Sequence, residues 1–212
     1  MDLIQALAAE LGKDPRHVEN VVHLLDEGNT IPFIARYRKE LHGAMDDTSL
    51  RTLEERLQYL RGLEERREAV KKSIDEQGKL TDELAAAIDS AKTLAEVEDL
   101  YRPYKQKRRT RATMAKEKGL EPLAALLFAQ ERDCPRPEEA ARDFVDPEKG
   151  VETVEDALQG ASDIIAEQIS DDAAIRKSLR ALISRQGQLV SRAATEDDSV
   201  YRLYYDFTQS VA

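Results

Sequence analysis

The segment DTSLRTLEERLQYLRGLEERREAVKKSIDEQGK, residues 47–79, decides the fold class of this chain. Its apolar residues recur every three or four positions, at Leu50, Leu53, Leu57, Leu60, Leu63, Val70 and Ile74. Glutamate and arginine fill the positions between them, with several favourable spacings of three or four residues. The pattern predicts one amphipathic helix of about 30 residues, ~45 Å long, that braces its own domain. The alternative is a coiled-coil dimer, but the stripe drifts after Leu63 and is short for such an assembly.

The residues before the long helix predict a small helical subdomain over residues 1–45. Asp14 can cap a helix that Gly28 ends, and Thr30 can cap another helix that continues as far as Leu41. Two helices joined by a short turn that contains glycine have the outline of a helix-turn-helix unit. Antiparallel helix pairs with short turns are common in all-α proteins, so that outline alone does not establish DNA binding.

The second helix of that unit carries three basic residues, Arg36, Arg38 and Lys39. If this helix docked in a major groove, these side chains would contact phosphates or bases. The sequence therefore makes them candidate nucleic-acid-binding residues.

The rest of the chain also reads as helices separated by Gly and Pro. Apolar residues make up 41% of the sequence, but aromatic residues only 5%, and Trp is absent, which suits aliphatic helix packing better than a β-sandwich. We therefore expect an all-α fold, with a helical domain over residues 46–187. The pattern changes after Gly187, where residues 188–192 predict a short extended segment. Residues 188–212 are expected to form a connector to further domains.

The segment EDLYRPYKQKRRTRATMAKEKGLEPLA, residues 98–124, concentrates positive charge. Its basic residues are Arg102, Lys105, Lys107, Arg108, Arg109, Arg111, Lys116 and Lys118. In the basic run between Tyr101 and Lys118, Glu117 is the one acid, so residues 101–118 carry +7 in a chain of formal net charge −10. Concentrated positive charge beside Tyr101 and Tyr104 is typical of a surface that meets phosphate. The alternative is a solvated basic turn that pairs with neighbouring acids.

Local signals place this basic run in a loop. Pro103 is expected to end a helix and to push Arg102 towards an extended conformation. Thr110 can cap the next helix, which is expected to end near Gly119. Basic residues at a helix start oppose the helix dipole, so helix stability does not explain them. An anion held jointly by the helix start and the basic loop would explain them.

The residues that most often carry catalysis are not arranged for it. His17, His23 and His42 lack the spacing of metal ligands, and no histidine lies near Cys134 to activate it. The sequence contains no Gly-rich phosphate loop, no GxSxG and no zinc signature. We expect no enzymatic activity, no metal and no cofactor.

Cysteine usage and hydropathy indicate a cytoplasmic protein. The single cysteine excludes an internal disulfide and suits a reducing compartment. The longest apolar run has seven residues, at 123–129, where a membrane span needs about 20. The amino terminus is amphipathic and acidic, without the features of a signal peptide. We expect no membrane partner.

Two strings resemble one known family specifically. NTIPFIARYRKE, residues 29–40, and the basic segment at residues 98–124 closely resemble the amino-terminal region of the bacterial Tex family of transcription accessory proteins. LDEGNT before the first string, the long helix between them, and ALQGASDIIAEQIS at residues 157–170 follow in the family's order. This chain departs from the family at Gln106, where a second proline is common, and at Arg102, where an aliphatic residue is frequent. The resemblance covers essentially the whole chain.

The resemblance implies a helical region with a helix-turn-helix-like part. Proteins of this family look like relatives of a eukaryotic transcription elongation factor that binds nucleosomes and RNA polymerase. They normally continue into a ribonuclease-H-like domain, a helix-hairpin-helix segment and an S1 RNA-binding domain, none of which fits in this chain. Much of the family's affinity for nucleic acid is attributed to the S1 domain. We therefore expect a fragment of a longer protein, which ends at Ala212 without a capping signal.

Two functional hypotheses follow. In the first, the chain binds RNA or DNA non-specifically, through phosphate contacts of the basic loop and a stacking face on Tyr101 or Tyr104. In the second, it is a protein-interaction scaffold whose acidic faces and long helix contact RNA polymerase or the missing domains. The residues outside the basic run carry a net charge of −17, which keeps the second hypothesis open.

Overall fold

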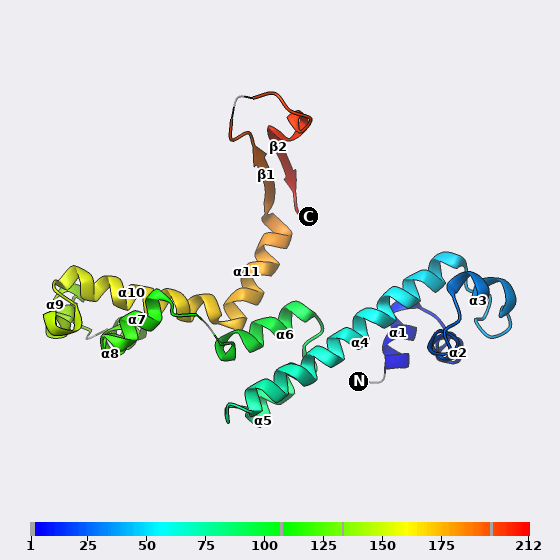
Figure 1. The fold of residues 1–212 in the computed structure, drawn as a ribbon, viewed down its shortest axis with the longest axis horizontal. Coiled ribbons are helices and arrows are strands. Elements are labelled where there is room, and N and C mark those ends of the chain that lie inside the picture. The colour runs from blue at the N-terminus through cyan, green and yellow to red at the C-terminus, as the bar shows by residue number, and fades with distance from the viewer. Residues whose placement is uncertain (1–2, 107, 133, 196) are drawn as a thin grey trace. The chain divides into compact units, whose positions relative to one another are not determined.

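The computed structural model describes residues 3–106, 108–132, 134–195 and 197–212 of the chain. Within these ranges it contains eleven α-helices and one two-stranded sheet, so the predicted all-α class is confirmed (Figure 1). The chain forms two compact units, Met1–Val97 and Glu98–Ala212, which are described separately. The division predicted after residues 45 and 187 stays a prediction.

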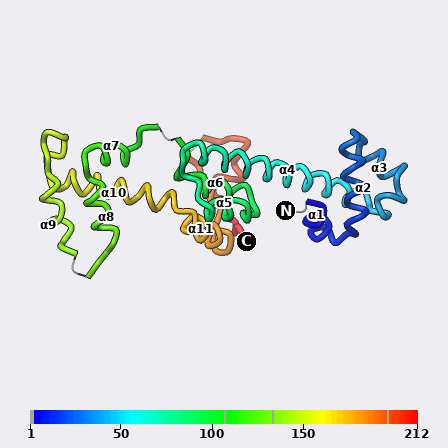
Figure 2. Tube along the Cα trace, turned by 90° about the horizontal axis from the view of Figure 1, so that it is seen from below, coloured from blue at the N-terminus to red at the C-terminus, as the bar shows by residue number. Residues whose placement is uncertain are grey.

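The first unit is built on α4 (Asp47–Asp75), the predicted long helix. Four shorter helices belong to this unit: α1 (Leu3–Leu11), α2 (Pro15–Asp26), α3 (Ile31–Tyr37) and α5 (Asp82–Ser90). All four pack against α4, so this helix braces its unit as expected (Figures 1 and 2). Asp46 caps α4 by accepting a hydrogen bond from the backbone N–H of Ser49 at 2.7 Å.

The predicted leucine stripe of α4 is buried. Its inward-facing side chains are Leu50, Leu53, Leu57, Leu60, Leu63, Val70 and Ile74. Arg67 is buried in the same stripe, and its guanidinium hydrogen-bonds Glu64 at 2.6 Å and also the carbonyl of Ala91. A carbonyl that follows α5 thus receives a charged donor from α4. The contacts with Glu64 and with the Ala91 carbonyl together satisfy two donor groups of Arg67 that burial would otherwise leave unpaired.

The third helix is shorter than the sequence predicts. α3 ends at Tyr37, so Arg38, Lys39 and Leu41 lie beyond it. Two side chains of α2, His17 and Asn20, reach the carbonyl of Leu41 at 3.0 and 3.1 Å. Arg38 leaves the helix with φ −131°, and the N–H groups of Leu41 and His42 donate to its carbonyl at 2.9 and 3.1 Å, so a separate turn follows α3. The predicted end at Leu41 was wrong, because the backbone turns at Arg38.

The turn between α2 and α3 is formed as predicted. Gly28 has φ +84°, in the left-handed region that residues with a Cβ rarely adopt. Thr30 precedes α3 as its N-cap residue, but its side chain makes no capping hydrogen bond. The helix pair therefore exists, and its use as a DNA-reading unit stays a prediction.

The second unit is built on α10 (Val154–Asp171). The other α-helices that lie wholly in this unit are α7 (Arg111–Glu117), α8 (Glu121–Ala129), α9 (Pro137–Ala141) and α11 (Ala173–Gln186). Figure 2 shows α7 and α8 beside α10, and together with α9 they enclose one apolar core. Thr153 and Asp156 form the reciprocal capping box that starts α10.

Four short 3₁₀ helices complete the helical structure of the described residues, at Arg102–Tyr104, Arg142–Phe144, Pro147–Lys149 and Arg202–Tyr204. The segment α6 (Leu94–Tyr101) leads directly into the first of them. Asp99 of α6 is buried and bonds two arginines of α11, Arg176 at 2.6 Å and Arg180. This ion-pair group fixes the start of α11 to α6.

An antiparallel hairpin follows α11. The predicted extended segment is β1 (Gln188–Arg192), and it pairs with β2 (Asp206–Ser210), which was not predicted. Gln188 lies opposite Ser210 and Arg192 opposite Asp206. In the part of the chain that the structure describes, no helix is both long enough and apolar enough to cross a bilayer.

Candidate nucleic-acid interface

The basic segment begins with a helical turn. Arg102–Tyr104 form a 3₁₀ helix that continues from α6, so the expected extended conformation of Arg102 was wrong. The N–H of Lys105 donates to the carbonyls of Tyr101 and Arg102 at 3.1 and 3.4 Å. Pro103 has no N–H, so it donates no hydrogen bond to the preceding turn. The chain becomes extended only at Lys105.

The end of the segment follows the prediction. The hydroxyl of Thr110 accepts a hydrogen bond from the N–H of Thr113 at 3.0 Å and starts α7. Gly119, just past the helix, has φ +86°, as a helix-terminating glycine should. The loop that carries the predicted phosphate contacts is therefore held between two defined helical turns.

Half of the basic residues are bound within the unit. Arg102 pairs with Asp171 at 2.9 Å, Arg109 with Glu117 at 2.6 Å and Lys116 with Glu121 at 3.1 Å, while Lys118 donates to the carbonyl of Gly150 at 2.7 Å. These four side chains behave as the alternative interpretation expects of a solvated basic turn.

Three of the others are exposed and form no ion pair with any residue in the described ranges. They are Lys105, Arg108 and Arg111, and we call them the loop cations. Lys107, also a predicted contact, lies outside the described residues. Tyr101 and Tyr104 are only half-exposed, so each offers part of a ring face.

A cleft of about 500 Å³ separates the basic loop from α10. Lys105 and Arg111 line one side, and three acids of α10 line the other: Asp163, Glu167 and Asp171. A phosphate inside this cleft would meet several carboxylates at short range, which is unfavourable. Phosphate contacts are therefore expected from the exposed loop surface and not from within the cleft.

The second predicted basic group lies on the first unit, at and after α3. Arg36 and Lys39 are exposed and Arg38 is half-buried. The guanidinium of Arg36 lies 5.5 Å from the centre of the Tyr37 ring, and that of Arg38 lies 5.2 Å from the centre of the Phe33 ring. The sequence identified the arginines but not the two rings as surface residues.

Spacing alone does not place both rings at the surface. Ile31 and Ile34 are buried, and at about 100° per residue Phe33 lies roughly 100° from Ile34 while Tyr37 lies only roughly 60° from it. The i, i+4 spacing of Phe33 and Tyr37 brings their rings together, but their exposure follows from how α3 packs in the fold.

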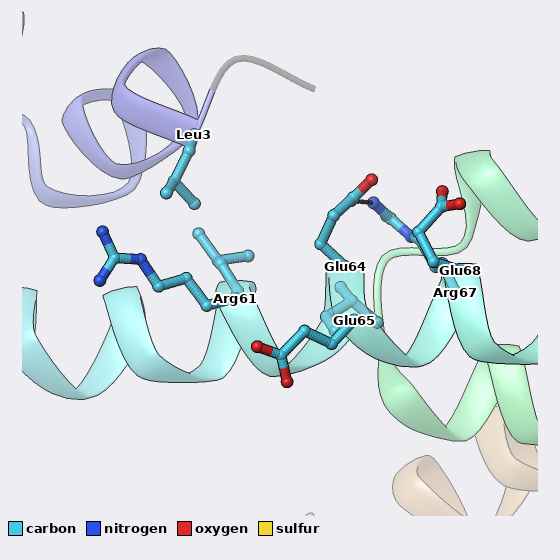
Figure 3. A pocket seen from close by; sticks show the side chains of 8 residues that line it. Leu3, Arg61, Glu64, Glu65, Arg67 and Glu68 are labelled. Atoms are coloured by element: carbon cyan, nitrogen blue, oxygen red, sulfur yellow. Dashed lines mark hydrogen bonds and ion pairs between the residues drawn. The ribbon is translucent and has the colours of Figure 1, made fainter.

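Another hollow of about 630 Å³ lies between α1 and α4 (Figure 3). Three leucines line it, Leu3, Leu60 and Leu63, together with Arg61, Glu64, Glu65, Arg67 and Glu68. Arg61 is paired with Asp26 at 2.7 Å and Arg67 with Glu64, so both cations are already bound. Among the described residues, no group of three or more His, Cys, Asp or Glu side chains could hold a metal ion.

An apolar face of α11 is exposed. Its residues, Ile175, Leu179, Leu182 and Ile183, recur at helical spacing and are between 36% and 56% exposed. The adjoining hairpin segment exposes Leu189, Val190, Val200 and Leu203 in addition. Contiguous exposed apolar surface of this kind usually meets another protein surface.

Comparison with known proteins identifies two family regions. Residues 1–75 match the Tex-like protein N-terminal domain, and residues 133–212 match the Tex central region. Protein YhgF of Escherichia coli is 50% identical over 94% of the chain, which spans 26% of that protein. Transcriptional accessory protein Tex of Neisseria gonorrhoeae is 42% identical over 98% of the chain, which spans 27% of that protein. The human S1 RNA-binding domain-containing protein 1 is 32% identical over 81% of the chain, which spans 17% of that protein.

Proposed function

This chain belongs to the Tex family, as its amino-terminal region, and on that premise we propose that it is a non-catalytic module that binds nucleic acid through phosphate contacts. The observation that carries the proposal is the exposure of the three loop cations, Lys105, Arg108 and Arg111, without a carboxylate partner in the described ranges. Arg102, Arg109, Lys116 and Lys118 are bound within the unit. Among the described residues of the segment, the loop cations are therefore the ones available to an external anion.

The chemistry of these side chains determines the kind of binding. Lysine and arginine that neutralise phosphates release counterions from the nucleic acid, and this release drives binding without regard to sequence. The contacts proposed for these side chains are to phosphate oxygens, which carry no sequence information, so specificity for a sequence is not expected. Two relatives, a transcriptional accessory protein and an S1 RNA-binding domain-containing protein, support RNA or DNA as the partner by their names.

The test compares two triple variants of equal charge. Lys105→Ala/Arg108→Ala/Arg111→Ala removes the loop cations. Lys72→Ala/Lys79→Ala/Lys92→Ala removes three exposed lysines of the other unit. Fluorescence anisotropy with labelled single-stranded RNA and duplex DNA at low salt should show roughly tenfold or greater weakening for the loop variant. The control variant should bind nearly as the parent does. Equal weakening in both variants would mean that net charge, and not the loop, governs binding.

A second function is favoured by the exposed face of α11. Here the chain is a scaffold that docks on the remaining domains of its longer protein, or on RNA polymerase. The relatives that this chain resembles are more than three times as long as the chain, so each of them offers a large partner surface within one polypeptide. The acidic net charge outside the basic segment would contribute to such docking.

The scaffold function predicts a specific loss. Leu179→Ser/Ile183→Ser replaces two exposed apolar side chains, so folding should be preserved while docking weakens. A pull-down with the separately produced remainder of the longer protein would measure this. Unchanged retention of the variant would exclude the α11 face as the docking surface.

A further inference from the structure

Four neighbouring side chains form an exposed aromatic and cationic surface on the first unit. The rings of Phe33 and Tyr37 lie 5.2 Å apart, centre to centre, at an interplanar angle of 46°. Arg38 lies over the first ring and Arg36 over the second. We call these four residues the α3 patch.

The fold does not require these rings at the surface. Ile31 and Ile34 supply the buried side of α3, at 3% and 0% exposure. Phe33 and Tyr37 remain 36% and 54% exposed on the outer side. Part of each ring is therefore open to solvent and available to a ligand.

The arginines of the α3 patch differ from Arg51, Arg56 and Arg61 of α4. These three arginines each pair with a carboxylate, at 2.7 to 2.8 Å. By contrast, Arg36 and Arg38 form no ion pair within the described residues. Arg38 donates to the carbonyl of Tyr37 at 3.2 Å, and both guanidinium groups face rings. A ring attracts a cation without neutralising it, so the positive charge stays available to a ligand.

From this arrangement we propose that the α3 patch is a binding site for unpaired bases of single-stranded nucleic acid. Bases of a single strand stack on aromatic rings and on guanidinium planes. Arg36 and the exposed Lys39 would then contact the adjacent phosphates. In a duplex the base faces are covered by neighbouring bases, so the site selects single strands. The site lies in the other unit from the loop cations and does not depend on them.

The positive charge of the α3 patch and of Lys39 favours a single strand over a protein as the ligand. Tyrosine and arginine also anchor protein interfaces, but an interface needs carboxylates on the partner to match three unpaired cations. A single strand supplies both a base face and a phosphate for each nucleotide. A single strand can therefore occupy the rings and the cations of the α3 patch at the same time.

The experiment measures preference for bases in the full chain. Two labelled 12-nucleotide strands carry the same phosphates, one with uracil bases and one with abasic sugars throughout. The parent chain should bind the uracil strand roughly tenfold or more tightly, because each stacked base contributes about 1–3 kcal/mol. Phe33→Leu/Tyr37→Leu should abolish that preference while its helix content, checked by circular dichroism, stays the same.

A control separates this proposal from the function of the basic loop. Lys105→Ala/Arg108→Ala/Arg111→Ala should weaken binding of both strands equally and leave the preference for bases intact. Equal binding of the two strands by the parent chain would overturn the α3 proposal without affecting the loop proposal. Persistence of the preference in Phe33→Leu/Tyr37→Leu would overturn it too. The proposal would also be overturned if this variant lost binding to RNA polymerase and kept the preference for bases, because the patch would then be a protein contact.

Discussion

Asp99 shows how one side chain organises the second unit. Its carboxylate is 7% exposed and accepts from Arg176 at 2.6 Å and from Arg180, which are 31% and 44% exposed. Replacing it by asparagine keeps its size but removes the charge that both guanidinium groups contact. Because both arginines can turn towards water, Asp99→Asn should lower the free energy of unfolding by about 1–3 kcal/mol. Urea unfolding followed by circular dichroism measures this loss.

An exposed ion pair of the same unit is the control for that prediction. Asp198 lies 3.7 Å from Arg202, and both side chains are at least 75% exposed. Such pairs contribute between zero and about 1 kcal/mol, so Asp198→Asn should leave stability nearly unchanged. If the two variants were equally stable, the Asp99 group would not hold α11 in place.

Two carboxylates of the first unit predict its response to acid. A hydrogen bond from Arg56 lowers the pKa of Glu10 below 4.5, and one from Arg61 lowers the pKa of Asp26 below 3.8. A lowered pKa in the folded state stabilises the protein above the unfolded pKa, and the stabilisation is lost as pH falls through the folded pKa. The contribution is at most about 1 kcal/mol for each exposed pair.

The corresponding measurement is thermal unfolding of the parent and of Arg56→Gln/Arg61→Gln at pH 7 and pH 3. The parent should have the higher Tm at pH 7, and the gap should narrow at pH 3 as both carboxylates take up protons. A gap that stays constant with pH would show that these pairs do not stabilise the folded unit.

At the scale of the helix, two glycines predict opposite effects. A Cβ at Gly160 of α10 would lie 2.3 Å from Leu120 Cδ1 and 3.3 Å from Ala115 Cβ, inside the core. Leu120 is 1% exposed, so it has little room to move, and Gly160→Ala should destabilise by about 1–3 kcal/mol. A Cβ at Gly62 of α4 would meet nothing within 4 Å. Gly62→Ala should therefore stabilise by about 0.5–1 kcal/mol. Urea midpoints that moved in the same direction for both would contradict this packing.

Helix prediction succeeded where the information is local. The leucine stripe defines α4 within its own residues, and Thr110 starts α7 in the same way. It failed where distant residues decide. α3 ends at Tyr37, and the turn after it is held by His17 and Asn20, more than 20 residues away, which bond the carbonyl of Leu41. Strand β2 depends likewise on pairing with β1, which no pattern inside β2 specifies.

At the scale of the whole molecule, the sequence located the basic segment but could not sort its cations. Arg102 is paired with Asp171, which lies 69 positions later in the chain. No spacing rule finds such a partner, so only the fold separates Arg102 from exposed Lys105 and Arg108. The same holds for Phe33 and Tyr37, whose exposure depends on which face of α3 meets α4. The sequence thus predicted where charge concentrates, and the structure shows which of these charges are available.

The salt dependence of binding tests the central claim most directly. The observed association constant for single-stranded RNA should be measured over a range of salt for the parent chain and for Lys105→Ala/Arg108→Ala/Arg111→Ala. If the three loop cations contact phosphates, the slope of log K against log salt should become shallower by about two units. The Lys72→Ala/Lys79→Ala/Lys92→Ala control should keep the parent slope. A slope unchanged in the loop variant would contradict the account, because the exposed cations would then make no phosphate contacts.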